Sequence, residues 1–365
     1  MRYKEKNIVF RVDAANHIGT GHLQRCITLA KELQKTGYQI IFVMIPFDLS
    51  FINLVKKESI NVITMSAPLL ESIKTDDSAT WLGRTQEDDA KDFLAVTRHI
   101  DFSWCIVDHY SIDYKWQKLV RKNISKIFVI DDLANRKHEC DILLDQNYWS
   151  NFLTRYDPLI NNNCLRLLGP KYSLLRDEFK TLRATENREK TELRNILINF
   201  GGIGNYVLLE KVATVLPQFS HKYNFTIITG KMTTSSFDVI KNKLASTGVN
   251  VTETTSNMAK LMFESDYAFG ACGSTVWERF CLGVNSALVE VADNQHELLG
   301  FLAHKSLVDY LGKASELSYE QIQSFIETLN LDSIIYSERK TRIMSLVDGE
   351  GATRVASKIK ELQYV

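Results

Sequence analysis

Residues 8–25 read IVFRVDAANHIGTGHLQR and decide the fold of the first half of the chain. Apolar residues 8–12 predict a short buried strand, a polar loop with two glycines follows, and apolar positions from Leu23 onward recur at helical spacing. In α/β proteins, anionic ligands bind where a strand runs through such a loop into a helix, because free backbone N–H groups and the helix dipole meet there. His22 lies at the start of this helix, so the stretch predicts chemistry beside a phosphate-bearing substrate.

The composition is that of an ordinary globular protein and excludes several classes. A length of 365 residues favours two domains, and 45% apolar with 24% charged residues is a common balance. The formal net charge of zero gives no sign of a nucleic-acid partner. No apolar run approaches the roughly 20 residues of a membrane helix. No signal peptide precedes the first strand, so we expect a cytoplasmic protein without membrane insertion. The six cysteines lack metal or disulfide spacing and are expected to be buried thiols.

Predicted strands and helices alternate on both sides of one polar segment. Strands are expected at 8–12, 39–45, 62–66, 104–108, 126–131 and 141–144, and again at 195–200, 224–229, 249–253, 267–270 and 285–291. Residues 178–192, EFKTLRATENREKTE, are too polar for a core and predict an exposed linker. The economical prediction is an α/β protein with two Rossmann-like domains, 1–185 and 186–365, facing each other across a cleft. The assignment allows the last helix of the chain to cross back and pack on the first domain.

The first candidate motif is Gly19-Thr20-Gly21-His22. Its glycines let the backbone approach a ligand closely, but the third glycine of a dinucleotide fingerprint is absent. Three charged residues lie nearby in sequence: Asp13 could hold an imidazole tautomer or bind sugar hydroxyls, Arg25 could offset phosphate charge, and Arg11 adds a further cation. The alternative is that His22 is only a helix cap or a packed side chain.

The second candidate motif is residues 270–279, GACGSTVWER, where another predicted strand runs through small residues into a helix. Gly273, Ser274 and Thr275 can offer N–H groups and hydroxyls to a diphosphate. Glu278 shares a helix face with them and suits the two hydroxyls of a ribose. The alternative is a capping box between Thr275 and Glu278.

Two further strand ends carry polar residues. Tyr110 follows the strand 104–108, and Asn294 and Gln295 follow the strand 285–291, so all three could meet a sugar at the carboxyl edge of a sheet. An ordinary turn and an ordinary helix cap are the respective alternatives. The carboxylates at 131–132 and 141–145 show no metal-ligand spacing and are interpreted as turns and caps.

These motifs together resemble the PseG family of UDP-2,4-diacetamido-2,4,6-trideoxy-β-L-altropyranose hydrolases. The resemblance runs in order through FRVDAANHIGTGHLQR, VDHYSID, IDDLANRKHECDILLDQN, LLGPKYSLLRDEF, NFGG and GACGSTVWERFCLGVN to ADNQ, that is, from about residue 9 to residue 295. The GxGH and GxxGSTxWER segments are fairly specific together, whereas either alone would also suit glycosyltransferases of the MurG group.

The resemblance implies a GT-B fold that binds UDP through its C-terminal domain, and a role in pseudaminic acid biosynthesis, which serves flagellin glycosylation and surface polysaccharide. It implies that His22 is the general base for water attack at the anomeric carbon, with inversion and C1–O cleavage. Tyr110 and Asn294 match sugar-facing positions, while Gly202, Ser274, Thr275 and Glu278 match the nucleotide site. No cofactor, no metal and no obligate protein partner is implied; the expected partner is the UDP-activated diacetamido sugar.

One loop departs from the family pattern. The family tends to carry an aspartate two residues after the Gly201-Gly202 pair, where this chain has Gly204. Two other functions therefore stay open: a UDP-sugar glycosyltransferase on the same fold, and a non-catalytic nucleotide-sugar-binding subunit.

Overall fold

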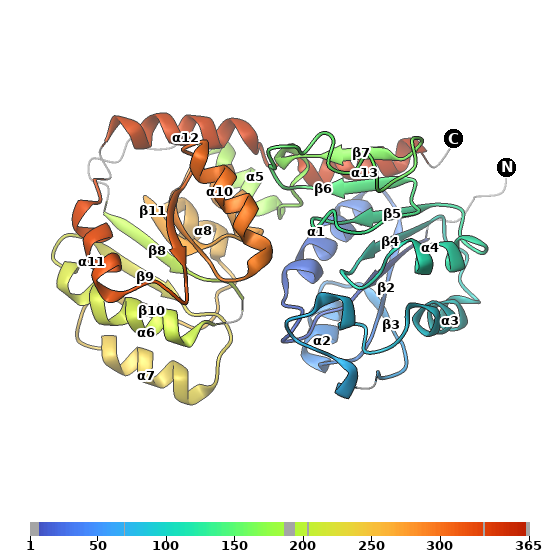
Figure 1. The fold of residues 1–365 in the computed structure, drawn as a ribbon, viewed down its shortest axis with the longest axis horizontal. Coiled ribbons are helices and arrows are strands. Elements are labelled where there is room, and N and C mark those ends of the chain that lie inside the picture. The colour runs from blue at the N-terminus through green and yellow to red at the C-terminus, as the bar shows by residue number, and fades with distance from the viewer. Residues whose placement is uncertain (1–6, 69, 186–193, 203, 331–332, 363–365) are drawn as a thin grey trace. The chain divides into compact units, whose positions relative to one another are not determined.

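The computed structural model describes residues 7–68, 70–185, 194–202, 204–330 and 333–362, which form two compact units (Figure 1). The first unit contains the described residues up to 147 together with 151–174 and 350–362. The second contains 148–150 and the described part of 175–349. The C-terminal helix α13 (Gly351–Leu362) thus belongs to the first unit, and α5 (Asp177–Ala184) belongs to the second.

The first unit is a parallel sheet of seven strands in the order β3-β2-β1-β4-β5-β6-β7. Near-continuous apolar runs form its central strands because helices cover both faces. The strands are β1 (Asn7–Val12), β2 (Gln39–Met44), β3 (Asn61–Thr64), β4 (Trp104–Asp108), β5 (Ile127–Ile130), β6 (Ile142–Asp145) and β7 (Leu165–Leu168). Their helices are α1 (Gly21–Lys35), α2 (Leu49–Lys57), α3 (Gln86–Thr97), α4 (Tyr114–Arg121) and α13, which packs against α1.

The second unit repeats this plan with six parallel strands in the order β10-β9-β8-β11-β12-β13. The strands are β8 (Asn195–Asn199), β9 (Asn224–Ile228), β10 (Asn250–Thr252), β11 (Tyr267–Ala271), β12 (Asn285–Glu290) and β13 (Asp309–Lys313). The helices are α5, α6 (Tyr206–Val215), α7 (Thr234–Leu244), α8 (Met258–Glu264), α9 (Thr275–Leu282), α10 (His296–His304), α11 (Tyr319–Thr328) and α12 (Ile334–Leu346).

Three sequence predictions about local structure need correction. The edge strands β7 and β13 were not expected, because β7 has only four residues and β13 carries Gly312 within a mixed sequence. The first part of the predicted linker 178–192 is helix α5, which buries Phe179 and packs against α8 and α9. A single fully buried aromatic residue thus outweighs the polar composition around it. Residues 186–192 lie outside the described residues.

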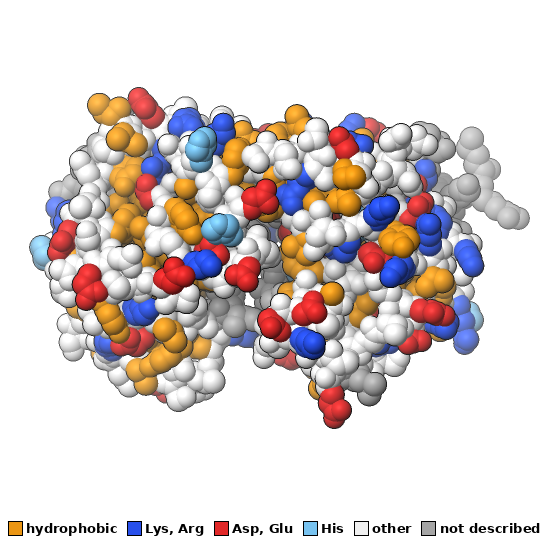
Figure 2. All heavy atoms as spheres, viewed as in Figure 1, with side chains coloured by type: hydrophobic (Ala, Val, Ile, Leu, Met, Phe, Trp, Pro, Cys, Tyr) orange, Lys and Arg blue, Asp and Glu red, His pale blue; other side chains and the backbone are white. Residues whose placement is uncertain are grey.

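The α/β fold class is confirmed, since each unit is a doubly wound parallel sheet. Within the described part of the chain, the structure contains no helix that is both long and apolar enough to span a membrane. Acidic and basic side chains are interspersed over the visible face of both units (Figure 2), in line with the zero net charge.

Candidate active site

Aspartates mark the carboxyl edge of the first sheet. Asp13 follows β1, Asp108 ends β4, Asp131 and Asp132 follow β5, and Asp145 ends β6. Because β1, β4, β5 and β6 are neighbouring parallel strands, these carboxylates lie along one edge, where doubly wound sheets bind ligands.

His22 is paired with Asp108 at this edge. Nδ1 of His22 lies 2.6 Å from Oδ1 of Asp108, and the imidazole is only 8% exposed. An ionised carboxylate can only accept at this distance, so we assign the hydrogen to Nδ1. Nε2 then carries the lone pair, and no hydrogen bond from another described residue engages it. This is the arrangement of a general base held in one tautomer.

Arg25 fixes the carboxylate that holds His22. Its Nε and Nη2 donate to the two oxygens of Asp108 at 2.6 and 2.7 Å, and its Nη1 donates to Asp132 at 2.9 Å. Burial alone would favour the neutral acid, but Arg25 and then His22 reverse this and hold the pKa of Asp108 well below its usual range. From sequence, Arg25 was expected to offset phosphate charge, which stays a prediction; in the structure its guanidinium donates to two carboxylates.

Tyr110 covers the imidazole. Its ring meets that of His22 edge to face with centroids 4.4 Å apart, and the ring of Trp81 lies 5.8 Å from that of Tyr110. Burial and the negative charge of Asp132 raise the pKa of Tyr110 well above its usual value, so the phenol keeps its proton. The ring contact brings Tyr110 next to His22, and the expectation that Tyr110 faces the sugar stays a prediction.

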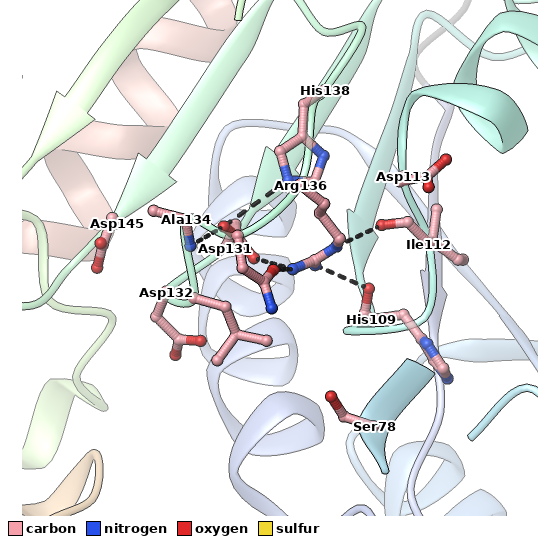
Figure 3. Close-up of polar contacts among 12 residues, drawn as sticks. Ser78, His109, Ile112, Asp113, Asp131, Asp132, Ala134, Arg136, His138 and Asp145 are labelled. Carbon is pink, nitrogen blue, oxygen red and sulfur yellow. Dashed lines mark hydrogen bonds and ion pairs between the residues drawn. The ribbon is translucent and has the colours of Figure 1, made fainter. Parts of the chain in front are cut away.

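Arg136 holds the loop after β4 through contacts with Ile112 and His109, as Figure 3 shows. Its Nε donates to the carbonyl oxygen of Ile112 at 2.9 Å and its Nη2 to that of His109 at 3.3 Å. Its Nη1 forms an ion pair with Oδ1 of Asp131 at 2.9 Å. The loop after β4 is thus tied to the end of β5, which restricts the position of Tyr110.

Arg11 and Asp13, both predicted to bind substrate, are completely buried. Nη1 of Arg11 lies 2.7 Å from Oδ2 of Asp13, while Nε and Nη2 donate to both oxygens of Asp89. Oδ1 of Asp13 accepts from the N–H of Ile45, and Oδ2 lies 3.4 Å from Nε2 of His109. With these partners, the structure gives Arg11 and Asp13 a supporting position beneath the edge.

The two glycines of the first motif sit at the turn into α1. Gly19 has φ +83°, a conformation that favours glycine, and Gly21 begins the helix. A Cβ on either would meet nothing within 4 Å, so the backbone here is open to a ligand. The N-cap residue Thr20 makes no side-chain hydrogen bond to the first turn of α1, which leaves N–H groups of that turn able to donate to a ligand.

Asp145 is a carboxylate at this edge whose acid form is favoured by burial. Burial raises the pKa of Asp145 to about 7, and the charge of Asp132 adds to the effect. Tyr156 Oη lies 3.2 Å from its Oδ2, and Oδ1 accepts from the N–H of Asn147 at 2.9 Å. The carboxyl row therefore carries less negative charge than its composition indicates.

The substitution Asp145→Asn is expected to raise the melting temperature at pH 8 by a few degrees, with a smaller gain at pH 5. The pKa of Asp145 is higher in the folded than in the unfolded chain, so its ionisation costs stability as the pH rises from about 4 toward 7. Asparagine cannot ionise and avoids this cost. Thermal unfolding at both pH values measures the effect, with the exposed Asp101→Asn as control. An equal change at both pH values for Asp145→Asn would contradict the explanation.

In the second unit, glycine-bearing loops follow adjacent strands. Gly201 and Gly202 come after β8, Gly230 after β9, and Gly273 after the neighbouring β11. A Cβ on Gly230 would lie 2.7 Å from the carbonyl oxygen of Gly201, so the loops after β8 and β9 touch. Gly202 and Gly273 lie at the same carboxyl edge of the sheet, and their expected role in binding the nucleotide stays a prediction.

The capping box that competed with the nucleotide site is not formed. Ser274 makes no side-chain cap at the start of α9, and Oγ1 of Thr275 instead accepts a hydrogen bond from Arg279 at 2.9 Å. The carboxyl group of Glu278 is 17% exposed and lies 3.6 Å from Nη2 of Arg176. Burial raises the pKa of Glu278, and Arg176 partly opposes this. Glu278 is therefore available to take hydrogen bonds from a ligand.

Asn294 and Gln295 form a short turn of helix after β12, at residues 293–295. The side chain of Asn294 is exposed, whereas Oε1 of Gln295 accepts from the N–H of Val291 at 3.0 Å. The side chain of Asn294 is therefore accessible to a ligand, whereas the hydrogen bond of Gln295 helps to hold the loop in its conformation.

The structure explains why glycine occupies position 204. Its N–H donates to the carbonyl oxygen of Lys231 at 2.8 Å, and a Cβ would lie 2.8 Å from the carbonyl oxygen of Thr229. An aspartate could not replace it without moving the loop after β9. The sequence departure at this position therefore accompanies a close approach of two backbones.

Three supporting residues were missed from sequence: Asp108, Asp132 and Arg136. Asp108 was quoted in the VDHY stretch and Asp132 was interpreted as a turn residue. The available signal was an aspartate at the end of each central strand, but pairing with His22 spans 86 residues of sequence.

Comparisons with known proteins agree with these motifs. No family model matches the chain. The chain is 28% identical over 303 residues to UDP-2,4-diacetamido-2,4,6-trideoxy-beta-L-altropyranose hydrolase of Campylobacter jejuni, covering 82% of this chain and 96% of the relative. The uncharacterised protein MJ1062 of Methanocaldococcus jannaschii is 25% identical, with 89% of this chain and 63% of that protein covered. The spore coat polysaccharide biosynthesis protein SpsG of Bacillus subtilis is 26% identical, with 53% of this chain and 58% of that protein covered.

Solved structures establish the fold. Acinetobacter baumannii MurG aligns with a TM-score of 0.67 and 15% identity over 97% of this chain and 99% of that one. The calicheamicin glycosyltransferase CalG4 aligns with a TM-score of 0.66 and 13% identity over 98% of each chain. A transferase from Siraitia grosvenorii, solved in complex with UDP, aligns with a TM-score of 0.64 and 12% identity over 98% of this chain and 100% of the other. The fold is GT-B, and similarity over most of its length confirms the resemblance of this chain to the PseG family of UDP-sugar hydrolases.

Proposed function

We propose that this protein hydrolyses UDP-2,4-diacetamido-2,4,6-trideoxy-β-L-altropyranose to UDP and the free sugar, a step of pseudaminic acid biosynthesis. The observation that carries the proposal is the His22–Asp108 pair, with Nδ1 and Oδ1 at 2.6 Å. The similarity to the Campylobacter jejuni hydrolase supplies the substrate. The wider role would be in flagellin glycosylation or surface polysaccharide.

In the proposed reaction, His22 accepts a proton from water at Nε2 as the water attacks C1 of the sugar. Asp108 stabilises the imidazolium that forms, and Arg25 keeps Asp108 ionised. The C1–O bond breaks with inversion and UDP leaves. A diphosphate is a good leaving group, so the main needs are a base and stabilisation of its charge. Tyr110 and Asn294 are proposed to contact the sugar, and Gly19 and Gly21 to bring the backbone close to it.

The second unit is proposed to bind the nucleotide. Gly273, Ser274 and Thr275 would bind the diphosphate through the open start of α9, and Gly202 would approach it from the loop after the neighbouring strand β8. Glu278 would accept hydrogen bonds from the ribose hydroxyls. Gln295 would hold the loop that presents Asn294. For Arg11, Asp13 and Arg25, burial and internal partners favour positioning roles beneath His22 over direct contact with substrate.

The substitution Glu278→Gln is expected to weaken UDP binding by about 10- to 100-fold, because hydrogen bonds to a charged acceptor contribute about 1.5–3 kcal/mol. The same substitution should leave the affinity for 2′,3′-dideoxy-UDP unchanged, since that ligand lacks the hydroxyls. Titration calorimetry with both ligands measures the difference, with the exposed Glu297→Gln as control. Equal weakening for both ligands would remove Glu278 from the ribose site.

The function is tested by incubating the protein with the UDP-activated altrose-configured sugar and no acceptor. Release of UDP and free sugar is expected. Turnover only with another UDP-sugar would refute the substrate. Turnover only after an acceptor is added would favour a glycosyltransferase, as the structural neighbour CalG4 is named. Binding without any turnover would favour a non-catalytic subunit.

A further inference from the structure

Arg279 is a buried cation in the last turn of α9. The residue is 1% exposed, and its side chain bends back along the helix so that Nη2 donates to Oγ1 of Thr275 at 2.9 Å. Long helical side chains point toward the helix start, so the guanidinium lies behind the open N-terminus of α9. The positive charge therefore adds to the positive end of the helix dipole.

The charge of Arg279 is not balanced in this structure. No described residue forms an ion pair with it, and its buried Nη1 has no hydrogen-bond partner. Burial lowers the pKa of Arg279 to about 10, with only partial opposition from Glu278. By contrast, the nearly buried Arg339 of the same unit makes two hydrogen bonds to Asp309, at 2.7 and 2.9 Å. A buried, unpaired charge is costly, so an anion near Arg279 would relieve an existing penalty.

The sheet is shaped to admit this guanidinium. A Cβ on Gly270 of β11 would lie 2.5 Å from Nη2 of Arg279 and 2.7 Å from the carbonyl oxygen of Asn199. No residue other than glycine fits at position 270 while Arg279 keeps this position. On the ligand side, a Cβ on Gly273 would meet nothing within 4 Å, so the start of α9 is open.

The hydrogen bond from Arg279 also directs the hydroxyl of Thr275. Oγ1 accepts from Nη2, so its own hydrogen must be donated elsewhere. The first-turn N–H groups of Val276 and Trp277 donate to the backbone, whereas the structure records no acceptor for those of Ser274 and Thr275 within the described residues. Two N–H groups and one hydroxyl are thus left to donate at a point backed by an unpaired cation.

We propose that Arg279 is a positioning residue for a diphosphate at the start of α9: it supplies the buried counter-charge and turns the hydroxyl of Thr275 toward the phosphate oxygens. The inference rests on the proposed function in taking UDP as the natural ligand. It differs from the role of Glu278, which concerns the ribose. It further requires that the charge of Arg279 contributes to binding and not to the stability of the unliganded protein.

The test compares Arg279→Met with Arg339→Met in the full chain, using UDP, uridine and inorganic pyrophosphate as probes. For Arg279→Met, UDP binding is expected to weaken about 10- to 100-fold with uridine affinity unchanged. Its melting temperature without ligand should equal or exceed that of wild type. Arg339→Met should lower the melting temperature and leave the UDP-to-uridine affinity ratio unchanged. In the double variant Arg279→Met/Thr275→Val, the fold-loss of UDP affinity should be smaller than the product of the fold-losses of the two single variants.

Several outcomes would overturn the proposal: an unchanged UDP affinity in Arg279→Met, equal weakening of UDP and uridine, or a lowered melting temperature without ligand. Arg279→Lys keeps the charge in case the methionine variant does not fold. It is expected to bind UDP with intermediate affinity and uridine normally, and full UDP affinity would contradict the directed contact. Pyrophosphate separates this inference from the nucleotide function. If it stabilises wild type but UDP does not, the anion site stands and the proposed function fails; if neither stabilises wild type, the inference is wrong.

Discussion

Replacing His22 with alanine or phenylalanine is expected to lower kcat by about 10²- to 10⁴-fold, which is the usual contribution of a general base. UDP affinity should be unchanged, because the proposed nucleotide contacts come from the second unit. Nε2 of His22 is the only imidazole nitrogen of this pair left to accept a proton, since Nδ1 is bonded to Asp108 at 2.6 Å. Steady-state kinetics and UDP titration measure the two effects.

The phenylalanine variant keeps a ring against Tyr110, so it separates loss of the base from loss of packing. His99→Ala is a suitable control because His99 is exposed in the same unit. Near-normal kcat in either His22 variant would remove His22 as the base. Loss of UDP binding together with kcat would mean that the histidine holds the nucleotide.

Replacing Asp108 with asparagine is expected to lower kcat by up to about 10⁴-fold, although the residue does not touch the substrate. Oδ1 accepts from His22 Nδ1 and Arg25 Nη2, and Oδ2 accepts from Arg25 Nε. An amide has one acceptor oxygen. If its NH₂ group faces His22, the imidazole must accept at Nδ1 and carry its hydrogen at Nε2, which disables the base. If the NH₂ group faces Nε of Arg25, two donors collide.

The variant should also unfold more easily, by about 3 kcal/mol, because a buried ion pair loses one partner. Asp113→Asn is the matched control: Asp113 caps α4 by accepting from the N–H of Lys115, and asparagine caps equally well. Kinetics and denaturant unfolding of both variants test the prediction. Unchanged kcat in Asp108→Asn would show that the carboxylate does not set the tautomer of His22.

Much of the fold follows from local pattern. The apolar runs of β1, β2 and β4 and the helical spacing after Leu23 predict their elements within a residue or two, because a parallel sheet covered on both faces needs such runs. Edge strands bury less, so β7 and β13 carry weaker signals and were missed. The return of α13 to the first unit depends on packing against α1, which no local pattern contains.

The candidate site shows the same division. His22 and Glu278 could be selected because each follows a strand and a small-residue loop, and Tyr110 could be selected because it follows the end of a strand. Arg11 was selected because it lies near the GxGH motif in sequence, yet its partner Asp89 lies 78 residues away on α3, and that contact buries the charge. The pairing of Arg25 with Asp108 and Asp132 likewise joins distant segments. Sequence proximity thus predicts which residues reach the edge, while tertiary contacts decide which of them remain open to a ligand.

The position of bond cleavage tests the central claim most directly. The protein is incubated in H₂¹⁸O with the UDP-activated altrose-configured sugar and no acceptor, and the released UDP is analysed by mass spectrometry. Water attack at C1 predicts UDP without label, since its terminal oxygen comes from the C1–O bond. The label is read in UDP because a free sugar can exchange its anomeric oxygen with water. UDP that carries one ¹⁸O would contradict the account. Water would then have attacked phosphorus, and His22 would not be the base for attack at C1 of the sugar.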